Sequence, residues 1–178
     1  MHSLKSVAPK YDPGEDRVLL AINAGQEDAW SCWLTRRMAL GALDRLNQYL
    51  NQTSAIAART PLEYRTEVAA MERQAAVTRM QKSIGSLPKK QLVSAAASGE
   101  LATGLRLKPQ AKSFLLEISG RAGGQARGLV SRAELQTILL LIEQEASKAG
   151  WLPVAPQPLT QELERQEASP VGKKRTVN

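Results

Sequence analysis

Few residues of this chain have side chains suited to catalysis, and none of them stands in a catalytic arrangement. The single histidine, His2, lies at the N-terminus, and the single cysteine, Cys32, falls in a predicted strand, so no Ser–His or Cys–His pair is expected. The carboxylate pairs 15–16 and 27–28 fall in predicted turns, where acidic residues favour the bend and stay solvated. The sequence holds neither a phosphate-binding glycine loop nor a cluster with metal-ligand spacing. It therefore predicts a protein that is not an enzyme, with no catalytic residue, no metal site and no cofactor.

The stretch "SGRAGGQARG" contains one tripeptide with a catalytic counterpart. Gly123, Gly124 and Gln125 resemble the GGQ tripeptide of peptide-chain release factors, which also has an arginine a few residues before it, here Arg121. The release-factor loop continues into a His-Val-Asn-type segment and a long helix, whereas residues 126–128 here continue into a predicted strand. Peptidyl-tRNA hydrolysis is therefore a remote alternative. A hairpin bend is the favoured interpretation, because glycine supplies the positive φ that such bends need.

The composition is typical of a small, basic, soluble protein. Its 178 residues, 43% of them hydrophobic, suffice for one packed domain with tails. One cysteine excludes an intramolecular disulfide, and the longest aliphatic run, residues 138–142, is far shorter than the roughly 20 residues that cross a bilayer. The N-terminus lacks the apolar stretch of a signal peptide, so a cytoplasmic location is expected. The net charge of +7 favours anionic partners.

An internal repeat organises the chain. Residues 17–35 align without a gap with residues 113–131, at an offset of 96. The aligned pairs include Leu20 with Leu116, Ile22 with Ile118, Thr35 with Ser131, Leu43 with Leu139 and Leu46 with Ile142. We therefore predict an α+β fold of two pseudo-duplicated β-β-(β)-α units. In this fold the units form an antiparallel sheet or sheets, the helices pack on one face, and a central helix joins the units.

Local patterns predict where strands and helices begin and end. Alternating apolar residues indicate strands over 18–22, 101–108 and 114–118, and Pro9 would confine the segment before the first of these to a sheet edge. Thr35 is the predicted N-cap of a first helix.

Capping residues also mark the helices that follow Ser131 and Thr60, and the end of a short helix at Gly99. Ser131 and Glu134 form a capping box for a helix that ends at a left-handed Gly150, with Trp151 folding back on its last turn. A cap at Thr60 starts a linker helix, and a short helix ends at Gly99.

These elements define the domain organisation. The expected parts are a flexible N-terminus or edge strand over 1–12, a single α+β domain over 13–151 and a disordered tail over 152–178. Within the domain we place the first repeat at about 13–50, the linker helix at about 60–82 and the second repeat at about 101–150.

The helix over 131–149 carries more apolar residues than one face can hold. Leu140 and Leu141 extend its apolar surface beyond the core stripe, which includes Ile138, and these three are the candidate partner-binding residues. A helix that is apolar nearly all round must be covered on several sides. The cover is either the linker helix or a partner, which would be another protein or a second copy of this chain. The sequence thus predicts an accessory module that acts through protein–protein interaction or self-association.

Nucleic acid is the alternative partner. The candidate residues on or beside the strands are Trp33, Arg106, Lys108, Arg121 and Arg127. An exposed aromatic among basic residues on a sheet can stack bases and track phosphates of single-stranded DNA or RNA. The repeated sheet-and-helix unit is similar, in topology alone, to the PUR and Whirly single-strand-binding folds. The competing interpretation, which we favour, packs Trp33 beneath a helix.

Overall fold

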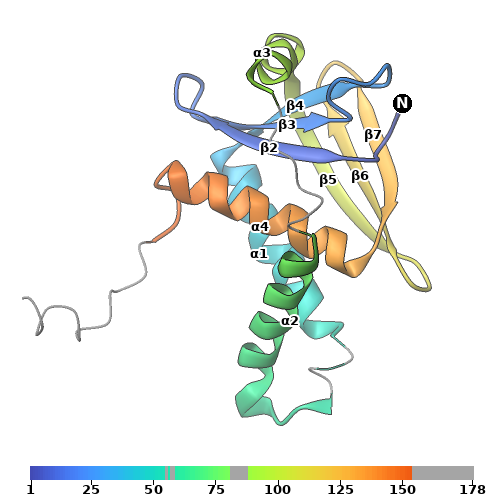
Figure 1. The fold of residues 1–178 in the computed structure, drawn as a ribbon, viewed down its shortest axis with the longest axis vertical. Coiled ribbons are helices and arrows are strands. Elements are labelled where there is room, and N and C mark those ends of the chain that lie inside the picture. Colours follow the sequence, from blue (N-terminus) through green and yellow to red (C-terminus); the bar gives the residue numbers. More distant parts are fainter. Residues whose placement is uncertain (55, 57–58, 81–87, 154–178) are drawn as a thin grey trace, which may run out of the picture.

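The fold is α+β, and the residues that the structure describes form one mixed seven-stranded sheet and four α-helices (Figure 1). The structure, a computed structural model, describes residues 1–54, 56, 59–80 and 88–153. Along the chain the elements are β1 (His2–Ser3), β2 (Val7–Asp12), β3 (Arg17–Ile22), β4 (Trp30–Thr35), α1 (Arg36–Gln52), the 3-10 turn η2 (Leu62–Tyr64), α2 (Arg65–Met80), α3 (Lys89–Ser98), β5 (Glu100–Pro109), β6 (Phe114–Gly120), β7 (Gln125–Val130) and α4 (Arg132–Lys148).

The sheet combines two antiparallel groups through a parallel contact, with strand order β1-β7-β6-β5-β4-β3-β2. Strands β2–β4 and strands β5–β7 are each antiparallel, but β4 pairs with β5 in parallel, and so does β1 with β7. The expectation of purely antiparallel sheets was therefore wrong. The chain passes through α1, α2 and α3 between β4 and β5, and so long a connection lets neighbouring strands run in the same direction.

The sheet must curl, because its two edge strands are close in sequence. Strands β1 and β2 lie at opposite edges, yet only residues 4–6 separate them. Seven flat strands would place the edges about 29 Å apart, whereas so short a linker spans only about 14 Å. The main-chain N–H of Leu4 donates to the carbonyl of Arg127 (2.9 Å), so this linker continues along β7 before it crosses to β2. The two edges of the curled sheet therefore face each other.

Helices cover both faces of the sheet, and not one face as expected. On the first face, Leu20 pairs directly with Cys32, and both side chains lie in the core together with residues of α1 and α4. On the second face, α3 packs over β3 and β4, and the hydroxyl of Ser31 donates to the carbonyl of Ala95 (2.6 Å). Strands β3 and β4 are thus buried on both sides.

Side-chain caps fix the two long helices. The hydroxyl of Thr35 accepts the N–H of Met38, and Ser131 and Glu134 form the predicted capping box. Helix α4 ends before Gly150, whose φ is +67°, and the N–H of Trp151 bonds back to the carbonyl of Ala146, as expected. Whether the two halves form a true structural repeat stays a prediction.

Two α-helices of the described residues, α2 and α3, lie between α1 and β5. Helix α3 ends at Ser98 with Gly99 as its C-cap, as expected. The linker helix starts later than predicted, because a 3-10 turn precedes α2 and the hydroxyl of Thr60 donates backward to the carbonyl of Ile56 instead of capping the helix. The tail beyond residue 153 lies outside the described residues. No helix in the described part of the chain is long and apolar enough to cross a membrane.

Candidate binding surfaces

A groove of about 730 Å³ opens between the two facing edges of the curled sheet. Residues 7–10 of β2 form one side, Leu129 and Val130 of β7 form the other, and Leu92 of α3 lies on the rim. Helix α4 provides the floor with Thr137, Ile138, Leu141, Gln144 and Glu145. The groove therefore lies between two strand edges, and Ile138 and Leu141 are the apolar side chains that α4 contributes to its floor.

Asn23 holds the N-terminal segment across one end of this groove. Its side chain is fully buried, and its carbonyl oxygen accepts the N–H groups of Lys5 (3.0 Å) and Ser6 (3.1 Å). The amide nitrogen of the same side chain donates to the carbonyl of Ser3. Its φ of +50° is left-handed, a conformation that asparagine tolerates better than most residues. This one residue therefore ties the β3–β4 turn to the segment between the two sheet edges.

The carboxylate inside the groove is already partnered. Glu145 is only 7% exposed, and it accepts the main-chain N–H of Tyr11 (2.7 Å) and a hydrogen bond from Lys148. Burial opposes ionisation, but these hydrogen bonds and the charge of Lys10 lower the pKa of Glu145 overall. Because that negative charge is satisfied, the exposed charges around the groove are mostly those of lysines.

The three predicted partner-binding residues separate onto two sides of α4. Ile138 and Leu141 line the groove. Leu140 lies one helical turn before Glu143, and the Glu143 carboxylate accepts a hydrogen bond from Arg73 of α2 (3.1 Å). Helix α2 thus covers the Leu140 side, while the other two residues stay available to a ligand in the groove. The linker helix therefore accounts for the Leu140 side, while cover by a partner stays a prediction.

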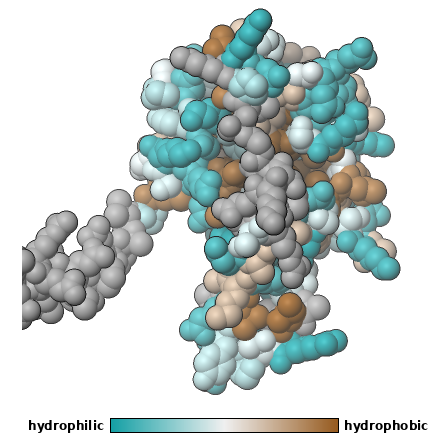
Figure 2. Space-filling view, viewed as in Figure 1, coloured by the Kyte–Doolittle hydropathy of each residue, from teal (hydrophilic) through white to brown (hydrophobic). Residues whose placement is uncertain are grey.

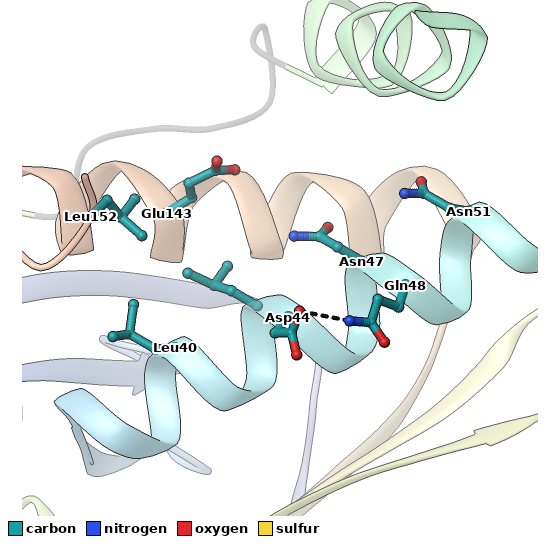
Figure 3. A pocket seen from close by; sticks show the side chains of 8 residues that line it. Leu40, Asp44, Asn47, Gln48, Asn51, Glu143 and Leu152 are labelled. Atoms are coloured by element: carbon teal, nitrogen blue, oxygen red, sulfur yellow. Dashed lines mark hydrogen bonds between the residues drawn. The ribbon is translucent and has the colours of Figure 1, made fainter. Parts of the chain in front are cut away.

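A smaller pocket of about 330 Å³ lies between α1 and α4 (Figure 3). Its lining is mostly polar, and the side chains bond to one another. Gln48 donates to Asp44 (2.8 Å) and Arg73 donates to Asn47 (2.8 Å). With amides and carboxylates engaged in this way, the pocket offers no free acid or base to a substrate.

Three of the predicted basic residues share the open face of β5–β7. Arg106, Glu117 and Arg127 lie opposite one another across the three strands. Lys108 forms an ion pair with Glu117 (2.9 Å), and this hydrogen bond, with the nearby arginines, lowers the pKa of Glu117. Arg121 lies in the β6–β7 turn, outside this row. The face is therefore cationic, with one carboxylate in its middle.

None of the tryptophans presents a free ring to this face. Trp33 is only 8% exposed and packs next to Gly99 beneath α3, the arrangement favoured from the sequence. Trp30 stacks on His2 and donates to Glu100 (2.8 Å). Trp151 is buried against Tyr11. A base-stacking role for Trp33 would require α3 to move.

The glycine-rich stretch forms the β6–β7 bend. Gly123 adopts a φ of +95°, the conformation that favours glycine. A side chain at Gly124 would overlap the carboxylate of Glu100 and the indole of Trp30, so the bend packs against those two groups. Gln125 opens β7 and is exposed. Packing and turn geometry thus account for both glycines of the tripeptide.

The side chains that could take part in catalysis or metal binding do not lie together in the described residues. Cys32 is fully buried, and burial, with the charge of Glu100, raises its pKa to about 12. The ring of His2 stacks on Trp30 and hydrogen-bonds the carbonyl of Asp28. Among the described residues, no group of three or more His, Cys, Asp or Glu side chains is placed to hold a metal ion.

Sequence reasoning missed the residues that shape the groove. Asn23 had a local signal, since an asparagine before a glycine-containing turn often takes a left-handed conformation. Glu145 had one too, because it stands among the buried positions of α4 and a buried carboxylate needs a partner. Leu129 had none. Its place at the groove depends on the curl of the sheet.

Comparison with known proteins does not identify the chain. No protein-family model matches it, and no curated protein or solved structure is significantly similar to it.

Proposed function

We propose that this protein is a binding module that holds a segment of a partner protein in the groove between β2 and β7. The observation that carries the proposal is the groove itself, whose sides are two strand edges and whose floor includes Ile138 and Leu141. Leu129 adds apolar surface at its side, since 65% of that residue is exposed. Contiguous apolar surface of this kind typically marks an interaction site.

A library of random peptides displayed on phage, selected against the full chain, tests this proposal. We expect selected peptides to lose affinity by about tenfold or more for Leu129→Ser. That substitution should leave the fold intact, because the side chain is already mostly in water. Met71→Ser is the matched control, since Met71 is 71% exposed and lies on α2 away from the groove. Peptides that bind Leu129→Ser as tightly as the unchanged chain would refute a protein-binding groove.

Self-association would use a different surface. Helix α2 projects from the body, and Figure 2 shows apolar atoms at the surface of that lobe. The exposed residues there are Leu62, Tyr64 and Met71. Light scattering on the full chain separates the two modes: a dimer sensitive to Met71→Ser indicates association through α2, and a monomer leaves the groove as the interaction site.

A polyanion on the open face of β5–β7 is the second candidate function. Arg106, Lys108 and Arg127 share that face and outnumber Glu117. The support is electrostatic only, because the tryptophans are engaged elsewhere. A single-stranded oligonucleotide should then bind with an affinity that falls steeply with salt, since phosphate contacts release counterions. Arg127→Glu should weaken this binding while leaving peptide binding in the groove intact. Binding that is independent of salt, or unchanged in Arg127→Glu, would exclude this face.

We also propose that the two halves are structural copies. Helices α1 and α4 are both 17 residues long, each follows a capping hydroxyl, and their first residues are separated by the same offset of 96 as the aligned strands. A superposition of 7–52 on 103–148 over main-chain atoms tests the duplication, and a mismatch in strand direction or helix placement would refute it.

A further inference from the structure

We infer that the occupant of the groove is an extended, acidic segment of a partner protein, added as a strand along the free edge of β2. The inference rests on the proposed function and deepens it, because it states the conformation and the charge of the bound segment. Three features carry it: the direction of the main-chain groups at the two edges, the balance of charges around the groove, and the shape of its floor.

The main-chain groups of β2 that face the groove follow from one hydrogen bond. The N–H of Tyr11 donates to Glu145 of α4, so it points away from β3. Alternate residues of a strand point their main-chain groups to the same side, so those of Val7 and Pro9 also point away from β3. The carbonyl of Ser6 accepts the N–H of Asn23, which places the other set of groups on the β3 side, in agreement.

The free edge of β2 therefore has a defined hydrogen-bonding pattern. Val7 presents both an N–H and a carbonyl to the groove, and Pro9 presents a carbonyl alone because proline has no N–H. An added strand can donate to both carbonyls and accept from the single N–H. Unpaired groups of this kind are the template on which extended peptides add to a sheet.

The edge of β7 points into the same groove. The carbonyl of Arg127 accepts the N–H of Leu4, so it faces away from β6. The main-chain groups of Leu129, two residues later, share that direction. A segment between the strands would thus meet polar main chain at both sides. A helix could not use these groups, because its own N–H and carbonyl groups are paired within the helix.

The charges around the groove favour an acidic segment. Lys5, Lys10 and Lys148 line it, and their side chains are 60%, 51% and 59% exposed. The two carboxylates in the lining are both engaged, Glu145 as described and Glu134 in the capping box of α4. Each lysine already has a carboxylate nearby: Lys10 and Lys148 share Glu145, and Lys5 pairs with Asp28 outside the lining. The lining nevertheless holds three ammonium groups against two carboxylates, and this excess of positive charge favours a partner with aspartate or glutamate side chains.

The floor of the groove accepts alternate side chains. Ile138 and Leu141 lie one helical turn apart on α4 and are partly exposed to the groove. Successive side chains of an extended segment point to opposite sides. One set can therefore pack on Ile138 and Leu141 while the other set, including the acidic residues, points toward the lysines and water. This describes a segment in which apolar and acidic residues alternate.

A synthetic peptide of about ten residues, the length of a long strand, tests the inference. The probe alternates valine with aspartate and carries a fluorophore, and the matched peptide has lysine in place of aspartate. Fluorescence anisotropy with the full chain should show the acidic peptide binding at least about tenfold tighter than the basic one. Lys10→Glu should reduce that preference, and Lys112→Glu is the matched control, because Lys112 is exposed in the β5–β6 turn and does not line the groove.

N-methylation of the probe tests strand addition separately from charge. Methyl groups on alternate amide nitrogens remove the donors on one side of an extended peptide only. We expect methylation of one alternate set to abolish binding and methylation of the other set to leave it within about twofold. Equal effects of the two methylated sets would overturn the added strand, because a bound helix or irregular coil has no such two-sided pattern.

Other outcomes show whether this inference fails alone or together with the proposed function. Selected peptides that are basic or helical, and that lose affinity for Leu129→Ser, would overturn this inference while leaving the proposed function standing. A dimer that Leu129→Ser dissolves would show that a second copy fills the groove. Slow hydrogen exchange at the N–H of Val7 without peptide would show that the edge is already paired. Either result overturns the peptide inference.

Discussion

Strands β4 and β7 hold the same position in the two halves of the chain but meet different surroundings. Each is the last strand before a long capped helix, with Thr35 or Ser131 at the cap. Four consecutive residues of β4, residues 31–34, are buried. In β7 only Ala126 and Val130 are buried, and the positions between them are exposed or half-buried. The difference lies on the face turned away from α1 and α4.

Helix α3 accounts for this difference. It packs over β3 and β4, and within the described part of the chain no helix packs in the same way over the corresponding face of β5–β7. The side chains match their surroundings: β4 places Ser31 and Trp33 under the helix, whereas β7 leaves Arg127 exposed and Leu129 mostly exposed at the side of the groove. Helix α3 thus buries a second face of β3 and β4, whereas the matching face of β5–β7 keeps exposed side chains.

The reactivity of a cysteine thiol should show the largest difference between β4 and β7. Burial, with the charge of Glu100, raises the pKa of Cys32 to about 12, whereas a cysteine introduced by Arg127→Cys should titrate near the ordinary value of about 8.5. At pH 8 the thiolate fractions then differ by roughly three orders of magnitude. A disulfide reagent should label the introduced thiol at once and Cys32 only on unfolding in urea. Rapid labelling of Cys32 in the native unchanged chain would show that β4 is not sealed.

The raised pKa also gives a direction to the alkaline pH dependence of stability. The folded state keeps its proton on Cys32 over the range in which the unfolded thiol loses it. The contribution is complete below about pH 8.5, the unfolded value, and decreases as the pH rises toward the folded value. Cys32→Ala should flatten this decrease in urea unfolding measured between those limits.

Truncation of the matched outward side chains should give the next largest contrast. Trp33→Ala empties the space beneath α3 and should lower the free energy of unfolding by about 3–5 kcal/mol. Leu129→Ala removes a side chain that is 65% exposed, so the change should stay within about 0.5 kcal/mol. Urea unfolding followed by circular dichroism measures both. Similar losses for the two variants would mean that β7 is covered as completely as β4.

The sequence predicted local features well because their causes lie within a few residues. The capping box of Ser131 and Glu134 spans one helical turn, and the left-handed Gly150 follows directly from its place at a helix end. The bend at 121–124 belongs to the same class. The apolar excess on α4 drew attention to Ile138 and Leu141, which line the groove, and their role in binding stays a prediction.

The features that the sequence did not predict depend on contacts between segments that are distant along the chain. The burial of Trp33 depends on α3, which lies more than fifty residues further along the chain, and the groove depends on the curl that brings β2 opposite β7. Nothing near Tyr11 in the sequence indicates that its N–H bonds to Glu145, 134 residues away. The parallel pairing of β4 with β5 has the same origin. Alternation patterns show which face of a strand is apolar but not which strand lies beside it.

Substitution of Gly124, which packs against the start of β4 and of β5, should have a moderate effect on stability. Gly124 lies in the turn before β7, and a side chain there would overlap Glu100 and Trp30, the first residue of β4. Gly124→Ala should therefore destabilise the protein by about 1–3 kcal/mol. Gly41→Ala is the matched control, since no atom lies within 4 Å of its added carbon, and it should stabilise α1 by about 0.5–1 kcal/mol. A neutral Gly124→Ala would show that the bend does not pack on β4.

The smallest effect should come from the carboxylate on the open face. The hydrogen bond from Lys108, with the charges of Arg127 and Arg106, lowers the pKa of Glu117. A lowered pKa means that the folded state holds fewer protons than the unfolded state, so the contribution is complete above about pH 4.3, the ordinary value, and is lost as the pH falls through the folded value. Glu117→Gln should be slightly less stable than the unchanged chain at pH 7 and equal to it at low pH. Urea unfolding at two salt concentrations measures this, and salt should shrink the difference because these charges are exposed. A difference that grows with salt, or that persists at low pH, would show that the open face of β5–β7 owes its stability to packing, as β4 does.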